Sequence, residues 1–478
     1  MDRELEAAVD AYVDEVWDDV LADIAALVAH PSVADEARAE PGAPFGPETR
    51  GALDAALGIA ARLGYETSDD EGYVGMADIA GTDPDAGQLA TIAHVDVVPA
   101  GPGWATDPFA MERREGWLLG RGVIDDKGPA VLGLYAGAFL IRDGRRPRHP
   151  FRALLGCDEE VGMTDVHHYL AGHPQPAFLF TPDAEFPVCN AEKGCFGATF
   201  TSAPIEGGRI VSWSGAEATN AVPGESELVL AVDAASLPAP RANADRIAIE
   251  PAGPRRARVH AHGIGGHASL PEGTLNAIGI VVGYLGEALA ADPDLLAAGE
   301  RRFLKLLRYL MADHTGAAVG IACADAAFGS LTLNAGTIEV TADGRLAQTV
   351  DIRYPAATTG EALAAALEPL AAAHGATVAV DRDKPPFSTD ADSPAVRALV
   401  DTYNEVTGEH AEPFAIGGGT YARNFERAVS FGPEDNRLAL PAWGGPMHGP
   451  NECANEALLR RALKIYTLAL IRLDELDL

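Results

Sequence analysis

QLATIAHVDVVP, at residues 88–99, is a short apolar run that ends in polar residues, and three further segments continue this pattern. They are GPAVLGLYAGAFLIRDG at 128–144, FRALLGC at 151–157 and PAFLFTPD at 176–183. Apolar strands that alternate with an apolar helix predict an α/β domain with an open, mostly parallel sheet flanked by helices. Ligands of such sheets lie beyond the carboxyl ends of the strands. The residues that follow these runs are therefore the first candidates for a functional site.

The character of the sequence changes in the middle of the chain. Alternating segments such as SELVLAVDA at 226–234 predict half-buried antiparallel strands, which suit a separate α+β domain. A long amphipathic helical pattern returns at 452–476. We therefore expect a first domain made of residues 1–195 and 386–478, with residues 196–385 inserted as a second domain.

Length and charge limit the possible functions. The 478 residues exceed the roughly 100–200 that one domain usually has, so the chain has ample material for two cores. It carries 70 Asp and Glu against 36 Lys and Arg, a formal net charge of −34. Such a surface repels phosphate backbones and lacks a polybasic membrane anchor, so neither nucleic acid nor a membrane is an expected partner. The acidity otherwise indicates a well-solvated surface, suited to high salt or simply to solubility.

The cysteines and the amino terminus indicate the compartment. Five cysteines without a Cys-x-x-Cys pair suggest neither a disulfide framework nor a cysteine-based zinc site. The first residues, MDRELEAAVDAYVDEVWDDV, are acidic and lack the apolar core of a signal peptide. We expect a protein of the cytoplasm.

Five polar motifs follow the predicted strands or open the predicted helices. They contain His94 with Asp96, the pair Asp125-Asp126, the run Asp158-Glu159-Glu160, Asp183, and His448 in a Gly/Pro-rich loop. Each has an ordinary structural explanation by itself: an Asx turn, a helix cap or a solvated run of charge. All five lie in the segments assigned to one domain, however. Two histidines and several carboxylates without cysteine form a ligand set that suits two Zn²⁺, Co²⁺ or Mn²⁺ ions.

These motifs carry a resemblance to a known family. In order they read HVDVVP, GRGVIDDKGP, DEEVG, PDAEFP, GGHASLP and MHGPNE. The set resembles the co-catalytic dizinc peptidase family, which includes carboxypeptidase G, aminoacylase, carnosinase, acetylornithine deacetylase and succinyl-diaminopimelate desuccinylase. DIRYP, IGGGTYAR and the large inserted segment are most similar to the PepV-type dipeptidase branch. The resemblance implies a catalytic α/β domain interrupted by a lid domain.

The resemblance also implies the metal ligands. His94, Asp125 and Asp183 would hold one divalent ion, while Asp125, Glu160 and His448 would hold the other, so that Asp125 bridges the two. Zn²⁺ is the expected metal, with Mn²⁺ or Co²⁺ as alternatives.

Asp96 and Glu159 are implied to act beside the ions. Asp96 would orient His94. Glu159 would be the general base that takes a proton from the metal-activated water and delivers it to the leaving amine.

Four kinds of residue are implied on the substrate side. His267 resembles a lid histidine that closes over the oxyanion, although a surface or core histidine is the plainer interpretation. Arg353 matches an arginine that binds the free carboxylate of a dipeptide, with a strand-surface ion pair as the alternative. Asn220 and the backbone at Gly418 and Gly419 are further candidates, and the glycines could equally mark a tight turn.

We therefore expect a dinuclear metallopeptidase that cleaves dipeptides or short peptides, acting as a monomer or a homodimer. The alternative enzyme is an N-acyl-amino-acid deacylase such as succinyl-diaminopimelate desuccinylase or acetylornithine deacetylase. An alternative of another class is a non-catalytic protein that binds metal or peptide.

Overall fold

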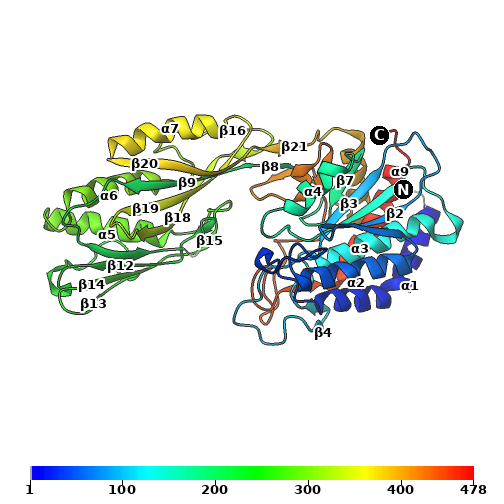
Figure 1. Cartoon of the computed structure of the whole chain (residues 1–478), viewed down its shortest axis with the longest axis horizontal. Helices are drawn as coiled ribbons and strands as arrows, with labels where there is room; N and C mark the ends of the chain where they lie inside the picture. Colours follow the sequence, from blue (N-terminus) through cyan, green and yellow to red (C-terminus); the bar gives the residue numbers. More distant parts are fainter. Residues whose placement is uncertain (1–2, 217) are drawn as a thin grey trace. The chain divides into compact units, whose positions relative to one another are not determined.

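The chain folds into two compact units in a computed structural model that describes residues 3–216 and 218–478 (Figure 1). The first unit contains the chain through Asn190, Ser388–Phe414 and Gly419–Leu478, and the second contains Ala191–Phe387 and Ala415–Gly418. The boundaries expected from the sequence, after residues 195 and 385, lie close to these limits. The division into a catalytic domain and a lid stays a prediction.

A mixed sheet forms the centre of the first unit. Its strands follow the order β1 (Glu66–Asp70), β2 (Val74–Ile79), β6 (Phe151–Gly156), β3 (Leu89–His94), β7 (Phe178–Thr181), β23 (Ala428–Ser430), β8 (Cys189–Glu192) and β21 (Phe387–Ser388), and β22 (Phe414–Ile416) also pairs with β8. The middle strands β6, β3, β7 and β23 are parallel, whereas β1, β2 and β8 join antiparallel. The parallel strands thus lie at the centre, where both faces are covered.

Helices cover this sheet. They are α1 (Arg3–Val28), α2 (Pro47–Leu63), α3 (Lys127–Ala138), α4 (Thr164–Gly172), α8 (Pro394–Thr407) and α9 (Glu456–Asp474). Helices α1, α2 and α3 lie side by side over one face (Figure 1). Every residue of α3 is buried, which explains why its sequence is apolar all round rather than striped.

Two details of these helices differ from the sequence prediction. The helix expected over 128–144 ends at Ala138 and continues as a 3₁₀ segment, Phe139–Gly144. The helix expected from 452 begins at Glu456, because Asn455 caps it by accepting a hydrogen bond from the Leu458 amide at 3.1 Å. The preceding residues form β24 (Cys453–Asn455), in a small sheet with β5 (Trp117–Leu119) and β4 (Glu112–Arg114).

The second unit is built from antiparallel sheets and helices with its own apolar core. One sheet has the order β18 (Thr332–Val340), β19 (Leu346–Tyr354), β9 (Gly194–Ser202) and β20 (Ala376–Lys384), and another has the order β10 (Ile210–Ser214), β12 (Glu225–Leu230), β14 (Ala257–His262) and β13 (Ile247–Pro251). Short pairs are formed by β11 (Ala221–Val222) with β15 (Gly266–His267) and by β16 (Ala324–Asp325) with β17 (Gly329–Ser330). The helices are α5 (Ala277–Ala291), α6 (Ala298–Leu310) and α7 (Gly360–Ala373).

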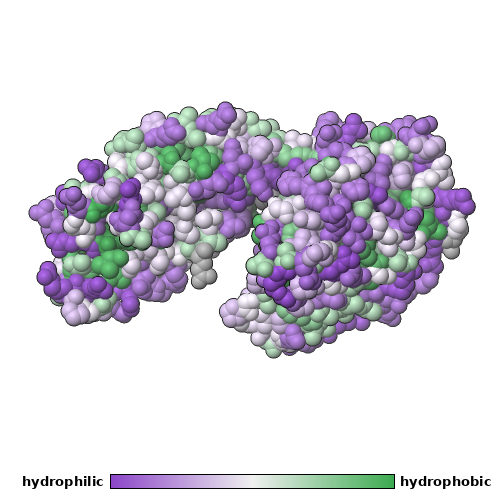
Figure 2. Space-filling model, viewed as in Figure 1, coloured by the Kyte–Doolittle hydropathy of each residue, from purple (hydrophilic) through white to green (hydrophobic). Residues whose placement is uncertain are grey.

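The surface agrees with the composition. Hydrophilic residues cover most of the visible face of each unit, with smaller apolar areas between them (Figure 2). Among the described residues, none of the helices is both long enough and apolar enough to span a membrane.

Candidate metal centre

The carboxyl ends of the central parallel strands bring the predicted ligands to one edge of the sheet. His94 is the last residue of β3 and pairs with Gly156, the last residue of β6. Strand β6 leads directly into the run that contains Glu159, and β7 ends two residues before Asp183. This is the edge at which ligands of open α/β sheets bind.

Asp125 lies between the two predicted histidine ligands. Its Oδ1 is 3.0 Å from His94 Nε2, and its Oδ2 is 2.7 Å from His448 Nε2. His94 Nε2 is also 3.9 Å from Asp183 Oδ2, and His448 Nε2 is 3.2 Å from Glu160 Oε2. Each oxygen of Asp125 therefore faces its own group of donors, as the carboxylate of a bridging ligand must.

Backbone contacts fix the tautomer of His94. Its Nδ1 lies 3.0 Å from the carbonyl oxygen of Asp96. A carbonyl oxygen only accepts hydrogen bonds, so Nδ1 carries the ring proton and donates it. Nε2 is then the nitrogen that faces Asp125 and Asp183, and it is the atom through which the imidazole would bind a metal.

Asp96 contacts both the His94 ring and the backbone of the acidic loop. Its Oδ1 is 3.4 Å from His94 Nδ1 and accepts a hydrogen bond from the Glu159 amide at 3.3 Å. Its Oδ2 accepts from the Glu160 amide at 3.2 Å. The fully buried Asp96 therefore fixes the position of the acidic loop relative to the histidine.

Glu159 faces the same group of donors. One ligand atom from each of His94, Glu159 and Asp183 lies within 4.8 Å of the others, and the same is true of His94, Asp125 and Glu160. Desolvation by the surrounding protein raises the pKa of Glu159 well above its usual value, and the charge of Asp183 adds to this effect. A carboxylate with a raised pKa suits proton transfer near neutral pH.

The carboxylates of the centre repel one another. Burial, and next the charge of Asp125, raise the pKa of Asp183 to about 7. Burial opposes ionisation of Asp125 as well, but hydrogen bonds from His448 and His94 hold its pKa well below the usual range. The hydrogen bonds to Asp125 and Glu160 raise the pKa of His448 to about 11. So much like charge in one place indicates a site that needs cations to balance it.

Glu434 is a residue of this region that the sequence analysis missed. Its backbone follows β23, and its amide donates a hydrogen bond to the carbonyl of Ala184 at 3.1 Å. Burial raises the pKa of Glu434 well above its usual value, and the charges of Asp183 and Asp125 raise it further. The signal that could have found it is the acidic GPED after the short apolar run AVSF, at 428–435.

The donor set fits two divalent ions. Its members are imidazole and carboxylate, the ligands that Zn²⁺, Co²⁺ and Mn²⁺ share. One oxygen of the buried Glu160 carboxylate, Oε1, has no hydrogen-bond partner among the described residues, so it is available to a cation. The backbone of His448 has a φ of 60°, in the left-handed region that only a few per cent of non-glycine residues adopt.

A buried ion pair holds the two loops that carry Asp125 and His448. Arg121 Nη1 is 2.5 Å from Glu452 Oε2, and both side chains are buried. Glu452 Oε1 also accepts from the Gly122 amide at 2.9 Å, while Arg121 Nη2 donates to the Gly449 carbonyl at 3.2 Å. The pair thus joins the loop before α3 to the loop before β24.

We expect Arg121→Met to lower the free energy of unfolding by about 3–5 kcal/mol, because it leaves the Glu452 charge buried without its partner. Urea denaturation measures this loss. Arg113→Met is the matched control, since Arg113 also pairs with a glutamate, Glu456, but is largely exposed. Equal losses in the two variants would contradict the role given to the buried pair.

The second unit places two of the substrate-side candidates, Asn220 and His267, close together. The Ala268 amide donates to the carbonyl of Asn220 at 2.8 Å, next to the pairing of Ala221 with His267. Ser269 Oγ is 2.7 Å from His267 Nδ1. The role of His267 over the oxyanion and the role of Asn220 in substrate binding stay predictions.

Arg353 is engaged with its own strand. Its Nε donates to Asp351 Oδ1 at 2.6 Å and its Nη2 to Asp351 Oδ2 at 3.2 Å. Its Nη1 donates to the Gly417 carbonyl at 2.6 Å and contacts Cys195 Sγ at 3.0 Å. The pair is buried, unlike the strand-surface ion pair that was the alternative expectation, and the carboxylate-binding role of Arg353 stays a prediction.

The glycine loop has two positions where an added Cβ would come too close to a neighbour, and only at Gly417 is that neighbour not the flexible end of a long side chain. A Cβ at Gly417 would lie 2.5 Å from the Cβ of Ser269, and a Cβ at Gly419 would lie 2.5 Å from Arg423 Nη1. At Gly418 the nearest atom would be 3.9 Å away, at Ile416. Gly417, which the sequence analysis did not select, therefore links Arg353 to the segment that carries His267.

The chain matches known proteins over nearly its whole length. The profile of peptidase family M20/M25/M40 matches residues 90–472. YtjP of Bacillus subtilis (strain 168) is 30% identical over 467 residues, which cover 95% of this chain and 97% of that protein. A beta-Ala-Xaa dipeptidase of Lactobacillus delbrueckii subsp. lactis is 29% identical, with 96% of each chain covered.

Solved structures show the same architecture. Human carnosine dipeptidase 1 superposes with a TM-score of 0.59 at 16% identity, covering 99% of both chains. Aminoacylhistidine dipeptidase from Vibrio alginolyticus gives a TM-score of 0.55 at 18% identity, covering 95% of this chain and 96% of the other. These likenesses support the fold alone, and the predicted fold class, an α/β domain interrupted by an α+β domain, is confirmed.

Proposed function

Because the chain belongs to peptidase family M20/M25/M40, we propose that it hydrolyses the amide bond of dipeptides or very short peptides with two divalent metal ions as cofactors. The observation that carries this proposal is the position of Asp125, whose two carboxylate oxygens lie 3.0 and 2.7 Å from the Nε2 atoms of two different histidines. The beta-Ala-Xaa dipeptidase relative supports the choice of substrate class.

The proposed ligands divide into two groups. His94, Asp125 and Asp183 hold one ion, and Asp125, Glu160 and His448 hold the other. Zn²⁺ is the proposed metal because imidazole and carboxylate ligands with open positions suit catalytic zinc, and Mn²⁺ or Co²⁺ suit the same donors. When bound, the ions supply a water of lowered pKa and polarise the scissile carbonyl.

The side chains of the protein handle the proton. Glu159 takes one proton from the attacking water and passes it to the nitrogen of the leaving amine, so that the C–N bond breaks as the new C–O bond is completed. Asp96 is a positioning residue, because its carboxylate accepts hydrogen bonds from the amides of Glu159 and Glu160. The raised pKa of Glu159 matches a group that must both accept and return a proton.

A panel of substrates tests the proposal. Enzyme loaded with Zn²⁺ is given unblocked dipeptides, tripeptides, and N-acetyl or N-succinyl amino acids, and the released amine is measured. We expect dipeptides to be cleaved fastest. Hydrolysis of N-succinyl-diaminopimelate without any cleavage of unblocked dipeptides would overturn the proposed substrate class.

We also propose that Arg353 binds the free carboxylate of the substrate, which predicts a specific effect of Arg353→Met. A lost charge-assisted hydrogen bond is worth about 1.5–3 kcal/mol, so kcat/KM for a dipeptide should fall about 10- to 100-fold, mainly through KM. The same dipeptide with an amidated C-terminus is the control substrate. It should react slowly with wild type and suffer little further loss in the variant. Equal losses on both substrates would show that Arg353 acts only through its ion pair with Asp351.

A further inference from the structure

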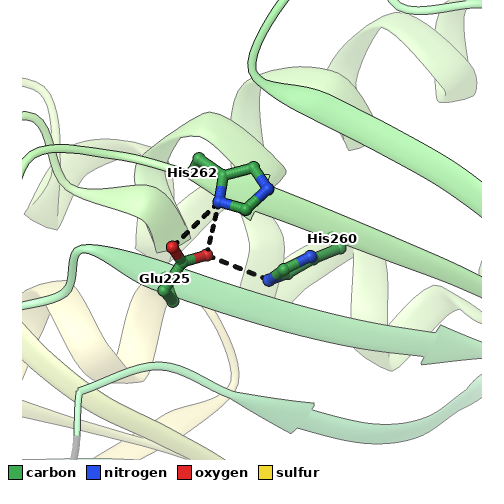
Figure 3. A group of neighbouring side chains, drawn as sticks. All are labelled: Glu225, His260 and His262. Carbon is green, nitrogen blue, oxygen red and sulfur yellow. Dashed lines mark hydrogen bonds and ion pairs between the residues drawn. The ribbon is translucent and has the colours of Figure 1, made fainter.

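A second group of metal-binding side chains lies in the other unit, on the sheet formed by β10, β12, β14 and β13. The carboxylate of Glu225 lies between His260 and His262 (Figure 3). His260 Nε2 is 2.9 Å from Glu225 Oε2, and His262 Nδ1 is 2.8 Å from the same carboxylate. The two rings have centroids 4.4 Å apart.

The strand pairing explains why the three side chains meet. Strands β12 and β14 are antiparallel, with Glu225 directly opposite His262. His260 is two residues before His262, so both imidazoles project from the same face of β14. The intervening Ala261 is buried on the opposite face, where β14 packs against α5. The three donors consequently lie on the outer face of the sheet.

The group is accessible to an ion from solution. The side chains of Glu225, His260 and His262 are 62%, 37% and 53% exposed. A short contact between an imidazole nitrogen and a carboxylate oxygen brings two lone pairs together unless a proton or a cation lies between them. Two such contacts converge on one carboxylate here, so a single divalent cation can replace two protons.

The neighbouring charged side chains leave Glu225 to the histidines. Arg258, on the same face of β14, is paired with Glu227 at 3.2 Å rather than with Glu225. Glu227 stands opposite His260, and its charge is offset by Arg258. The guanidinium of Arg246 is 3.5 Å from the backbone carbonyl of His262. These arginines are thus directed to other acceptors, and Glu225 remains the carboxylate shared by the histidines.

We propose that Glu225, His260 and His262 form a binding site for one divalent transition-metal ion of the Zn²⁺ type, separate from the dinuclear centre. Two imidazoles and one carboxylate are a standard set of three protein ligands for zinc, with water in the fourth position. Ligands about 2.0–2.1 Å from a tetrahedral ion are about 3.3 Å apart, so exposed side chains need only small outward movements to admit one.

The position of the site gives the ion a structural role. Glu225 follows β11 closely, and His262 precedes β15 closely, and these two short strands pair with each other. The Gly263 amide already donates to the Gly224 carbonyl at 2.7 Å. An ion at Glu225 and His262 would add a second link next to the β11–β15 pair, which carries His267 and follows Asn220, and would slow the local opening of this strand pair.

Metal uptake by the full-length, untagged protein tests the site. The wild type, the double variant His260→Ala/His262→Ala and the control His410→Ala are stripped with a chelator and dialysed against rising buffered Zn²⁺. Bound zinc per chain is then measured by mass spectrometry. His410 is an exposed histidine elsewhere in the chain, so its removal shows the effect of losing a surface histidine without touching the site.

At saturation we expect the wild type and His410→Ala to bind one Zn²⁺ more per chain than the double variant. Zn²⁺ should also slow hydrogen exchange over residues 225–230 and 257–267 in the wild type and not in the double variant. Identical uptake curves for all three proteins would overturn the site, and unchanged exchange in the wild type would overturn its structural role. Because the readout is a difference between variants that share the dinuclear centre, the outcome does not depend on the proposed function.

Discussion

Glu159→Gln is expected to reduce kcat for dipeptide hydrolysis by about 10²–10⁴-fold while the protein keeps its metal ions, because general acid–base catalysis contributes a factor of this size. The amide of Gln has the shape of the carboxylate but cannot accept a proton from water at neutral pH. The backbone N–H of residue 159, which donates a hydrogen bond to Asp96 Oδ1 at 3.3 Å, is unaffected by the change of side chain. The loop should therefore keep its position.

The measurement combines steady-state kinetics with metal analysis of the same preparation. Glu115→Gln is the control, since Glu115 is an exposed glutamate whose side chain is 71% accessible. The control should hydrolyse dipeptides at the wild-type rate. If Glu159→Gln kept both its ions and its full rate, the proton-transfer role of Glu159 would be wrong.

Asp125→Asn is expected to weaken metal binding and to lower activity strongly. Asn offers one acceptor oxygen where Asp125 offers two, so the atom that replaces Oδ1 or Oδ2 can no longer bind a cation. The histidines that face those oxygens, His94 and His448, lose their shared anionic partner. We expect at least one ion fewer per chain, and a fall in activity of about 10³-fold or more, because several kcal/mol of charge stabilisation disappear.

Asp107→Asn provides the control for Asp125→Asn. Asp107 accepts a hydrogen bond from the Phe109 amide at 2.9 Å in an exposed turn, so its replacement changes the charge equally without reaching the centre. The ion content of the two variants is compared after identical stripping and reloading. A variant Asp125→Asn with the wild-type ion content and rate would rule out a bridging carboxylate.

The sequence predicts the location of those residues of the centre that end or directly follow a central strand. His94 ends β3, and the acidic run with Glu159 follows β6, so the rule that parallel strands present ligands at their carboxyl ends brings these residues to one edge. Asp183 follows from the same rule through β7. For these residues, the position directly after a strand was sufficient to predict that they lie at the same edge of the sheet.

Other features depend on contacts between distant parts of the chain. Arg121 and Glu452 are 331 residues apart, and no local pattern shows that they pair. Glu434 was missed because β23 has only three residues, too few to show a strand periodicity. Arg353 was selected for its chemistry, but its hydrogen bonds to Asp351 arise from the geometry of one strand and from the burial of both side chains.

In the second unit, too, some contacts could not be predicted from the sequence pattern. The alternating pattern at 226–234 predicted a strand, and β12 overlaps it. It did not show that Glu225 would stand opposite His262, because the register between two strands depends on how the sheet is assembled. The contact of Gly417 with Ser269 likewise needs the folded backbone to become visible.

In the proposed reaction, dipeptide hydrolysis depends on metal ions that are held at Asp125. The most direct test is the rate of dipeptide cleavage by chelator-stripped enzyme as Zn²⁺, Mn²⁺ or Co²⁺ is returned, with Glu159→Gln treated in parallel. We expect no hydrolysis by the stripped protein, recovery of the wild type as metal is added, and no recovery of Glu159→Gln despite equal metal uptake. Full hydrolysis by the stripped wild type would contradict the proposed reaction.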